Sequence, residues 1–492
     1  MSQPFNSSTW LLDRWIGEGY GDRTAVRVEG RSVTYSELLE QTRAVATGLR
    51  ELDTRPEERI FIAMFNSDQF IAAILGAMRI GAIPTLANVL LPAKELAAVA
   101  RDARATVAIV APRVADQGFA ALVPELRATV VEPKWNDSTN GDPYATVEDS
   151  PGFWLCTSGS TGTPKLAMHR HVDLKHSFDT YARGVLDITD EDRAFSVAPI
   201  SHAYGLGASI TFPLGAGGVS IVEPSFPTPP PRIAEVAAAE KPTLFFAAPG
   251  AYAALAAAEL PRDCFASVCY GVSAAEALPA EIWRRFHDRY GVEILDGVGS
   301  TEATHIFLSN RPGDIELGTV GTIVPGFEAR LVDESGHEVA DTEPGRLFVK
   351  GESIATGYWC QAELSRQTFQ GEWVHTGDMY SRAPNGRYTY LGRSNDMFKS
   401  SGEWVSPAEV EGILTEHAAV LEAAVVAEAD ADGLVRPAAF VRLVADASVD
   451  EHELLDWSRT RLPGFKRPRR VTVVDELPKT LTGKIQRFRL RD

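Results

Sequence analysis

A run of small hydroxyl residues and glycines ends in a lysine between positions 157 and 165. Glycines let backbone N–H groups approach a phosphate closely, hydroxyls add further donors, and the lysine supplies the balancing charge. A flexible linker has a similar composition, but an apolar stretch expected as a strand, 153–156, precedes the run. The run therefore predicts a phosphate loop. Its candidate nucleotide-binding residues are Thr157, Ser158, Gly159, Ser160, Thr161, Gly162 and Lys165.

The loop is not a Walker A motif. Counted from Gly159, that motif requires Gly at position 164 and Ser or Thr at position 166. The chain has Pro164 and Leu166 there. The loop therefore argues against the usual P-loop kinases and GTPases.

A second candidate site is the segment G-S-T-E at 299–302, which follows an expected short strand at 293–298. A carboxylate at such a strand end is suited to hold the Mg²⁺ that accompanies a nucleotide. Taken alone, the segment is also compatible with a helix N-cap. The phosphate loop favours the metal-binding interpretation of Glu302.

The order T-S-G-S-T-G-x-P-K resembles the signature of the adenylate-forming superfamily. This superfamily includes acyl-CoA synthetases, luciferases and the adenylation domains of peptide synthetases. Six segments that resemble family motifs follow one another in the family's order between Thr157 and Arg487. One departure is Leu166, where the family usually has Gly, and it leaves open how the residues behind the loop pack.

The resemblance implies two walls for an adenine base. They would be formed by Ala274, Ala275 and Glu276 on one side and by Asp296, Gly297 and Val298 on the other. Ala275 stands where the family usually has Gly. Many members have an aromatic residue at the position of Val298, so aliphatic packing on the base is expected here.

The resemblance also assigns residues to the rest of the nucleotide. Asp378 in H-T-G-D would accept hydrogen bonds from the ribose hydroxyls, which suits an acceptor-only carboxylate. Arg393 would support the same ribose and phosphate side of the nucleotide. Thr301 would contact the α-phosphate region, and Glu302 would hold Mg²⁺. Lys484 would be the catalytic lysine, because an ammonium group can hold a carboxylate and a phosphate together while charge develops.

Within the superfamily, the segments 201–207 and 301–310 are most similar to benzoate-CoA ligases and related aryl-CoA ligases. The similarity implies that an aromatic ring lies among Ala203, Tyr204, Gly299, His305 and Ile306. Flat, apolar walls suit such a ring. His305 would contact a ring substituent, and the alternative is a histidine satisfied inside the core. His202 stands where relatives have an aromatic gate between acid pocket and thiol tunnel.

These assignments imply a two-step reaction. An aromatic acid and ATP with Mg²⁺ would give an acyl-adenylate, and the thiol of CoA would then displace AMP. The family rotates its small domain between the steps. The hinge position, commonly Asp or Lys, is Asn395 here. Two alternatives stay open: an enzyme that loads the acid onto the phosphopantetheine of a carrier protein, and a catalytically silent nucleotide-binding relative.

Hydrophobic periodicity predicts an α/β fold. Alternating strands and helices indicate mainly parallel sheets in βαβ layers. The expected strands are 31–34, 59–65, 82–86 and 106–110, and the expected helices are 36–52, 68–80 and 93–103. The proline-dense stretch 227–231 is expected to be a stiff connection that interrupts this alternation.

A domain boundary is expected near Asn395, where the chain becomes a short, charged α+β unit. The large domain would be residues 1–394, and a small mobile domain would be residues 395–492. The first helix of the small domain is signalled by Ser406 at the N-cap, Pro407 at N1 and Glu409 at N3, which together predict a capping box.

Composition limits the partners. The 492 residues carry a formal net charge of -18, which argues against a nucleic-acid surface. The N-terminus lacks the pattern of a signal peptide, and no stretch is apolar enough to cross a bilayer. The 4 cysteines form no C-x-x-C pair and are expected to be reduced. We therefore expect a cytoplasmic enzyme, monomeric or homodimeric, with no membrane partner.

Overall fold

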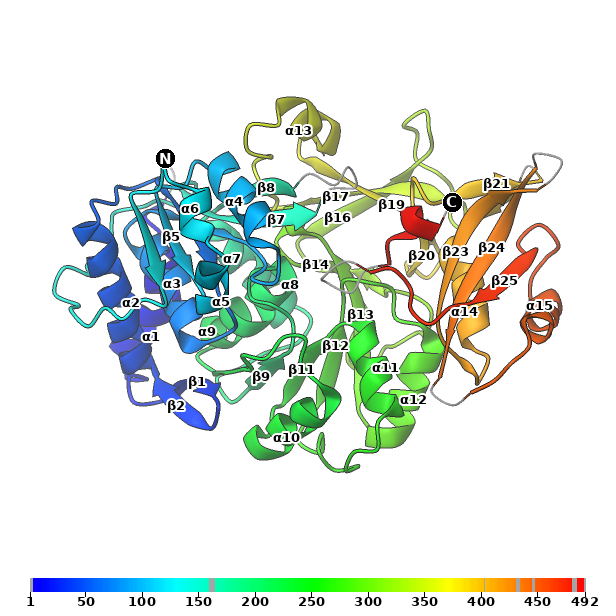
Figure 1. Ribbon diagram of the computed structural model, residues 1–492, viewed down its shortest axis with the longest axis horizontal. Helices are drawn as coiled ribbons and strands as arrows, with labels where there is room; N and C mark the ends of the chain where they lie inside the picture. The colour runs from blue at the N-terminus through cyan, green and yellow to red at the C-terminus, as the bar shows by residue number, and fades with distance from the viewer. Residues whose placement is uncertain are drawn as a thin grey trace.

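The computed structural model describes residues 3–158, 164–401, 403–430, 434–444, 447–479 and 485–490 (Figure 1). Strand β3 (Arg59–Ala63) shows how the sheets are covered on both faces. Ile60 and Ile62 enter one hydrophobic cluster, whereas Phe61 and Ala63 enter another. Successive side chains of a strand point to opposite faces, so both faces of this sheet are buried.

The sheet that contains β3 is six-stranded, in the order β6-β5-β3-β4-β7-β8. Its strands are parallel except for β8, which pairs antiparallel with β7 at the edge of the sheet. The other strands are β4 (Ile83–Leu86), β5 (Val107–Val110), β6 (Ala128–Val131), β7 (Pro151–Ser158) and β8 (Pro164–Arg170).

A nine-stranded sheet has the order β15-β14-β13-β12-β11-β9-β10-β1-β2. It is parallel from β1 to β13 and antiparallel at both edges. The prediction of mainly parallel α/β sheets is confirmed. Its strands are β1 (Thr24–Val28), β2 (Arg31–Thr34), β9 (Arg193–Ser196), β10 (Val219–Val222), β11 (Leu244–Ala247), β12 (Tyr270–Ser273), β13 (Glu293–Gly299), β14 (Ile306–Ser309) and β15 (Thr322–Ile323).

Helices α2 (Tyr35–Glu51) and α3 (Asp68–Arg79) belong to the hydrophobic cluster that both sheets share. Gly81 follows α3 with φ +74°, as expected for the glycine after a helix. The other helices of this part are α1 (Arg14–Gly17), α4 (Ala93–Asp102), α5 (Pro112–Asp116), α6 (Phe119–Leu122), α7 (Val172–Ser177), α8 (Ala203–Leu206), α9 (Phe212–Ala216), α10 (Pro230–Glu240), α11 (Pro249–Ala257) and α12 (Ala280–Tyr290).

The proline-dense stretch differs from the expectation. Pro229 is the N-cap of α10 and Pro230 is its first residue, so the stretch opens a helix and does not interrupt the alternation. Proline is tolerated in the first helical turn because the N–H groups there have no partner within the helix.

A five-stranded antiparallel sheet follows. It contains β16 (Phe327–Val332), β17 (Gly345–Gly351), β18 (Phe369–Gln370), β19 (Trp373–Arg382) and β20 (Tyr388–Arg393), with α13 (Ala362–Thr368) before β18. The C-terminal part has a hydrophobic cluster of its own. Its elements are β21 (Phe398–Ser400), β22 (Glu403–Val405), α14 (Pro407–Thr415), β23 (Val420–Ala429), β24 (Val435–Leu443), α15 (Glu451–Arg459) and β25 (Arg470–Val473).

Helix α14 begins as predicted, but its cap has only one half of the expected box. Ser406 Oγ accepts a hydrogen bond from the backbone N of Glu409 at 3.1 Å. The Glu409 carboxylate instead accepts from Lys466 Nζ at 2.8 Å. The ion pair with Lys466 therefore replaces the second half of the capping box.

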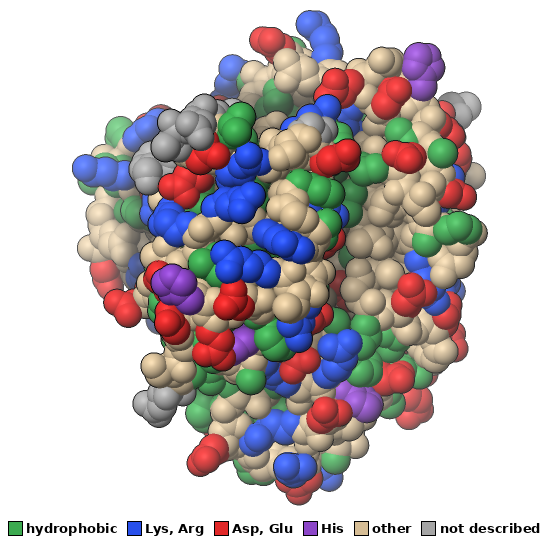
Figure 2. Space-filling model, turned by 90° about the vertical axis from the view of Figure 1, so that its right-hand side faces the viewer, with side chains coloured by type: hydrophobic (Ala, Val, Ile, Leu, Met, Phe, Trp, Pro, Cys, Tyr) green, Lys and Arg blue, Asp and Glu red, His purple; other side chains and the backbone are tan. Residues whose placement is uncertain are grey.

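Acidic and basic side chains are mixed on the face of the molecule that carries this C-terminal part (Figure 2). Arg470 pairs with Glu428 at 3.0 Å, and Arg459 pairs with Asp456 at 2.7 Å. Across the described ranges, no helix is long and apolar enough to span a membrane.

Candidate active site

The candidate metal carboxylate lies on a short turn at the end of β13. The turn is a 3-10 helix, Thr301–Ala303, and Ser300 Oγ caps it by accepting from the backbone N of Ala303 at 3.2 Å. Gly299 leads into the turn, and a Cβ at that position would lie 2.2 Å from the carbonyl oxygen of His305. Only glycine fits this close approach. The turn presents Glu302 at the carboxyl end of a parallel strand, the usual place for ligands in such sheets.

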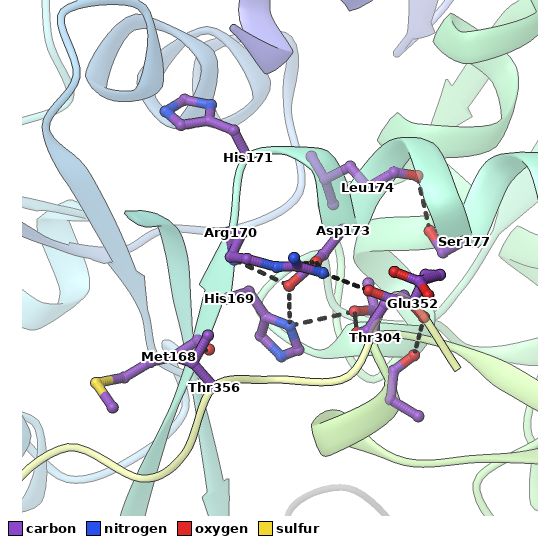
Figure 3. A network of polar contacts seen from close by, with 12 residues as sticks. Met168, His169, Arg170, His171, Asp173, Leu174, Ser177, Thr304, Glu352 and Thr356 are labelled. Atoms are coloured by element: carbon purple, nitrogen blue, oxygen red, sulfur yellow. Dashed lines mark hydrogen bonds and ion pairs between the residues drawn. The ribbon is translucent and has the colours of Figure 1, made fainter. Parts of the chain in front are cut away.

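A buried polar network supports this turn (Figure 3). His169 Nε2 lies 2.9 Å from the carbonyl oxygen of Thr301. His169 Nδ1 lies 3.3 Å from Asp173 Oδ2 and 3.2 Å from Thr304 Oγ1. Thr304 Oγ1 donates to the carbonyl oxygen of Ser353 at 2.6 Å. The network ties strand β8 to the turn that carries Glu302.

The predicted phosphate loop joins β7 to β8, so a strand and not a helix follows it. Thr157 ends up opposite Lys165 in this antiparallel pair. Residues 159–163 lie outside the described residues, and so do the predictions for Gly159, Ser160, Thr161 and Gly162; the same holds for the side chain of Ser158. Leu166 is buried in the hydrophobic cluster on the far face of the six-stranded sheet. The residue that replaces the family's glycine therefore packs inside the core.

Asp378 and Arg393 face each other across β19 and β20. Arg393 Nε lies 3.2 Å from Asp378 Oδ1, and Arg393 Nη1 donates to the carbonyl oxygen of Thr376 at 3.2 Å. The Asp378 carboxylate raises the pKa of Arg393 and is the largest cause of that shift. The arrangement holds the carboxylate that is predicted to bind the ribose.

The candidate adenine walls come from the ends of β12 and β13, where Ser273 and Asp296 are partners in the parallel ladder. Val298 packs against the main hydrophobic cluster. Ala275 is exposed and has φ +79°, a backbone conformation that favours glycine. Gly297 lies in β13, and Ala274 is buried and Glu276 half-buried just beyond β12.

The residues predicted to line the ring of the acid lie around His305, a buried side chain packed among aromatic rings. Its ring lies 4.4 Å from that of Phe212, 5.4 Å from that of Tyr181 and 5.7 Å from that of Tyr204, measured between centroids. Tyr204 is on α8 next to buried Ala203, and Ile306 is buried at the start of β14. The structure therefore brings together the residues predicted to line an aromatic ring.

One ring nitrogen of His305 forms a hydrogen bond with the backbone. Nε2 lies 3.3 Å from the carbonyl oxygen of Tyr204. A carbonyl oxygen only accepts, so Nε2 carries the proton and Nδ1 keeps its lone pair. Nδ1 is buried without a hydrogen-bond partner among the residues that the structure describes. Burial lowers the pKa of His305 to about 3, so the ring is neutral near pH 7.

The remaining candidates lie at the edges of the site. His202 Nε2 accepts from Asn88 Nδ2 at 3.2 Å, a contact between positions 114 residues apart. Asn395 is exposed in the turn after β20. Lys484 lies outside the described residues, as does the rest of 480–484.

Comparison with known proteins supplies the family. A family model described as AMP-binding enzyme matches residues 13–359, and one described as AMP-binding enzyme C-terminal domain matches residues 409–484. The chain belongs to the AMP-binding enzyme family. The predicted superfamily is thereby confirmed.

Among the relatives of this AMP-binding enzyme is a benzoate–CoA ligase of Thauera aromatica, 38% identical, with 99% of this chain and 96% of that protein covered. A 4-hydroxybenzoate–CoA/benzoate–CoA ligase of Rhodopseudomonas palustris is 37% identical over 99% of this chain and 94% of its own length. The structure of a benzoate CoA ligase from Burkholderia xenovorans LB400 is similar with a TM-score of 0.92 at 40% identity, covering 99% of this chain and 100% of that one. An anthranilate CoA ligase in complex with anthranoyl-AMP has a TM-score of 0.93 at 34% identity, covering 100% and 97%.

The donor set of this AMP-binding enzyme fits a metal ion that arrives with the nucleotide. No group of three or more His, Cys, Asp or Glu side chains suited to a metal occurs in the described part of the chain. Mg²⁺ is typically bound through one or two carboxylates together with substrate phosphates and water. A single carboxylate such as Glu302 meets that requirement.

Sequence reasoning missed several residues of the site. Tyr358 contacts Glu302, and His169 with Asp173 supports the turn beneath it. None of these residues lies in the segments that were noted above for their resemblance to family motifs. Their contacts join positions 56 and 132 residues apart, which no local pattern predicts.

Asp296 yields a prediction about stability. Burial raises the pKa of its carboxyl to about 8. Between about pH 4 and pH 8, the unfolded chain has lost this proton while the folded chain keeps it, so the free energy of unfolding falls as pH rises. Asp296→Asn should remove this loss, and urea unfolding midpoints at pH 5 and pH 8 would measure it. The exposed Asp263→Asn is the control, and parallel pH curves for parent and Asp296→Asn would contradict the prediction.

Proposed function

We propose that this enzyme activates an aromatic carboxylic acid with ATP and transfers the acyl group to the thiol of CoA. The observation that carries the proposal is the aromatic cluster around His305, in a chain whose full-length relatives are named as aryl-CoA ligases. Flat ring faces suit an aromatic substrate better than a flexible chain, which would have to be ordered on binding.

The reaction has two balanced steps. A carboxylate oxygen of the acid bonds to the α-phosphorus of ATP, and pyrophosphate leaves. The thiol sulfur then bonds to the acyl carbon, AMP leaves, and the thiol proton passes to solvent. Mg²⁺, carried in with ATP, supplies charge neutralisation on the phosphates.

The chain's own residues position the reactants. Lys165 and the phosphate loop would bind the outer phosphates, and Glu302 would bind the metal ion. Asp378 would accept from the ribose hydroxyls, kept in place by Arg393 at 3.2 Å. Lys484 would bind the reacting oxygens during adenylation only. Rotation about Asn395, between a large domain of 1–394 and a small one of 395–492, would then replace Lys484 for the thiol step.

The free lone pair on His305 Nδ1 indicates which substituent the ring of the aromatic acid carries. A buried acceptor without a partner is costly, and a hydroxyl or amino group on the ring of the acid would donate to it. We therefore infer that the preferred acid is a hydroxy- or aminobenzoate.

The test is pyrophosphate exchange with benzoate, the isomeric hydroxy- and aminobenzoates, hexanoate and octanoate. Aryl acids should exceed linear acids, and one isomer with a donor should exceed benzoate by about 10-fold in kcat/KM, the worth of one buried hydrogen bond. His305→Leu should abolish that difference. Tyr181→Phe, which changes a neighbouring ring of the same cluster, should retain it.

Two results would overturn these statements. Better exchange with octanoate than with any benzoate would contradict the assignment of an aromatic acid as the substrate. A donor preference that survives in His305→Leu would remove His305 from the argument. Adding CoA or a phosphopantetheinylated carrier protein to the same mixtures identifies the acceptor, and we expect thioester with CoA.

A further inference from the structure

One segment, 353–359, connects the two halves of the candidate phosphate site. On one side, the backbone N of Ala355 donates to the carbonyl oxygen of Glu302 at 2.8 Å. On the other side, the segment runs beside β8: Met168 N donates to Gly357 O at 3.0 Å, and Trp359 N donates to Leu166 O at 2.9 Å. The segment therefore fixes the Glu302 turn relative to the strand that begins beside Lys165.

Tyr358 lies in this segment and contacts both charged groups. Its hydroxyl donates to Glu302 Oε1 at 2.5 Å. Lys165 Nζ lies 5.2 Å from the centroid of its ring, within the range of a cation–π interaction. The side chain is only 5% exposed and packs on Phe369, with 5.3 Å between ring centroids. Burial, followed by the Glu302 charge, raises the pKa of the phenol, so it stays protonated and can donate.

This placement keeps two opposite charges separate. Among the residues that the structure describes, no ion pair joins Lys165 to Glu302, and Glu302 Oε1 accepts a hydrogen bond from Tyr358 instead. A direct pair would neutralise the cation needed for the phosphates and the anion needed for the metal, and it would have to break before the nucleotide could bind. The phenol satisfies one oxygen of Glu302 and leaves its other lone pairs available.

We propose that Tyr358 is a positioning residue that presents Glu302 and Lys165 to ATP and its metal ion as two separate charges. The proposal rests on the proposed function, because Glu302 and Lys165 are assigned to the nucleotide there. It adds a residue that would act through Glu302 and Lys165, the two charged side chains that it contacts.

The test is calorimetric titration with ATP, with and without Mg²⁺, in the absence of any acid. Tyr358→Phe keeps the ring over Lys165 and removes the hydrogen bond to Glu302. It should raise the Mg²⁺ concentration for half-maximal enhancement of ATP binding by about 10-fold, the lower end for a hydrogen bond to a charged group, and leave metal-free ATP binding unchanged. Tyr358→Leu also removes the ring, so it should weaken metal-free binding as well.

A double-mutant cycle with Glu302→Gln separates positioning from folding. If Tyr358 acts through Glu302, Tyr358→Phe should have no further effect on the Mg²⁺ dependence in the Glu302→Gln background. The matched control is Tyr290→Phe. It removes a buried hydroxyl outside segment 353–359, one that donates to the carbonyl oxygen of Leu255 at 2.8 Å. It should leave the Mg²⁺ dependence unchanged.

A second variant tests the same proposal without changing Tyr358 itself. Ser365→Ala removes the hydroxyl that accepts from the backbone N of Tyr358 at 2.9 Å and should shift the Mg²⁺ dependence in the same direction by a smaller factor. An unchanged Mg²⁺ dependence in Tyr358→Phe, or an equal effect with and without Glu302, would overturn the proposal. If the parent enzyme itself binds no ATP, the proposed function fails instead.

Discussion

Lys484→Ala should lower the rate of adenylation by about 10²-fold or more, the cost of removing one preorganised electrostatic donor. In the first step, two anions must approach each other, and the lysine ammonium would hold both. In the second step, the acyl-adenylate is already activated and needs no such help. The variant given synthetic aroyl-adenylate and CoA should therefore form thioester at close to the parental rate.

The measurement compares both half-reactions in one preparation. Lys479→Ala is the matched control, because Lys479 belongs to the same C-terminal motif but pairs with Glu422. It should affect neither step strongly. Equal losses in both half-reactions of Lys484→Ala would mean that this lysine is structural, and they would leave the predicted hinge at Asn395 without a function.

Asp378→Ala should raise the KM for ATP by about 10²-fold and change the KM for the acid little. The carboxylate would accept from two ribose hydroxyls, and hydrogen bonds to a charged group contribute roughly 1.5–3 kcal/mol each. The substitution also leaves Arg393 without the carboxylate that lies 3.2 Å from its Nε. 2′,3′-Dideoxy-ATP, which lacks both hydroxyls, should bind parent and variant with similar affinity.

The control for Asp378 is another Asp–Arg pair of the five-stranded sheet region. Asp341 Oδ1 lies 2.7 Å from Arg382 Nε, and both side chains are partly exposed. Asp341→Ala should leave the KM for ATP unchanged. If both variants raise this KM alike, the effect comes from the stability of the sheet and not from ribose binding.

The fold was predictable where local signals agree. Helix α3 is an example, because an apolar stretch after Ser67 ends before Gly81, and the structure has Ser67 as N-cap and Gly81 at φ +74°. The class of sheet and the family were predicted correctly. The capping box of α14 was predicted in full but formed by half, because a lysine 57 residues from Glu409 in sequence competes for its carboxylate.

The candidate site was predictable only where resemblance supplied it. Tyr204 and His305 were expected near one ring, and the structure places their rings 5.7 Å apart. Sequence could not show which nitrogen of His305 is free, because the backbone carbonyl that fixes the proton belongs to a helix 101 residues earlier. Tyr358 was missed for the same reason, since a lone tyrosine has no pattern that distinguishes it from the core.

The hydrogen bonds of segment 353–359 have a consequence for how the protein opens. Because the segment makes backbone hydrogen bonds with both β8 and the Glu302 turn, neither of these stretches can move away from it without breaking some of these bonds. Their amides should therefore exchange with solvent deuterium as one cooperative unit. We therefore expect the strand that carries Lys165 and the turn that carries Glu302 to keep their relative positions when ATP binds.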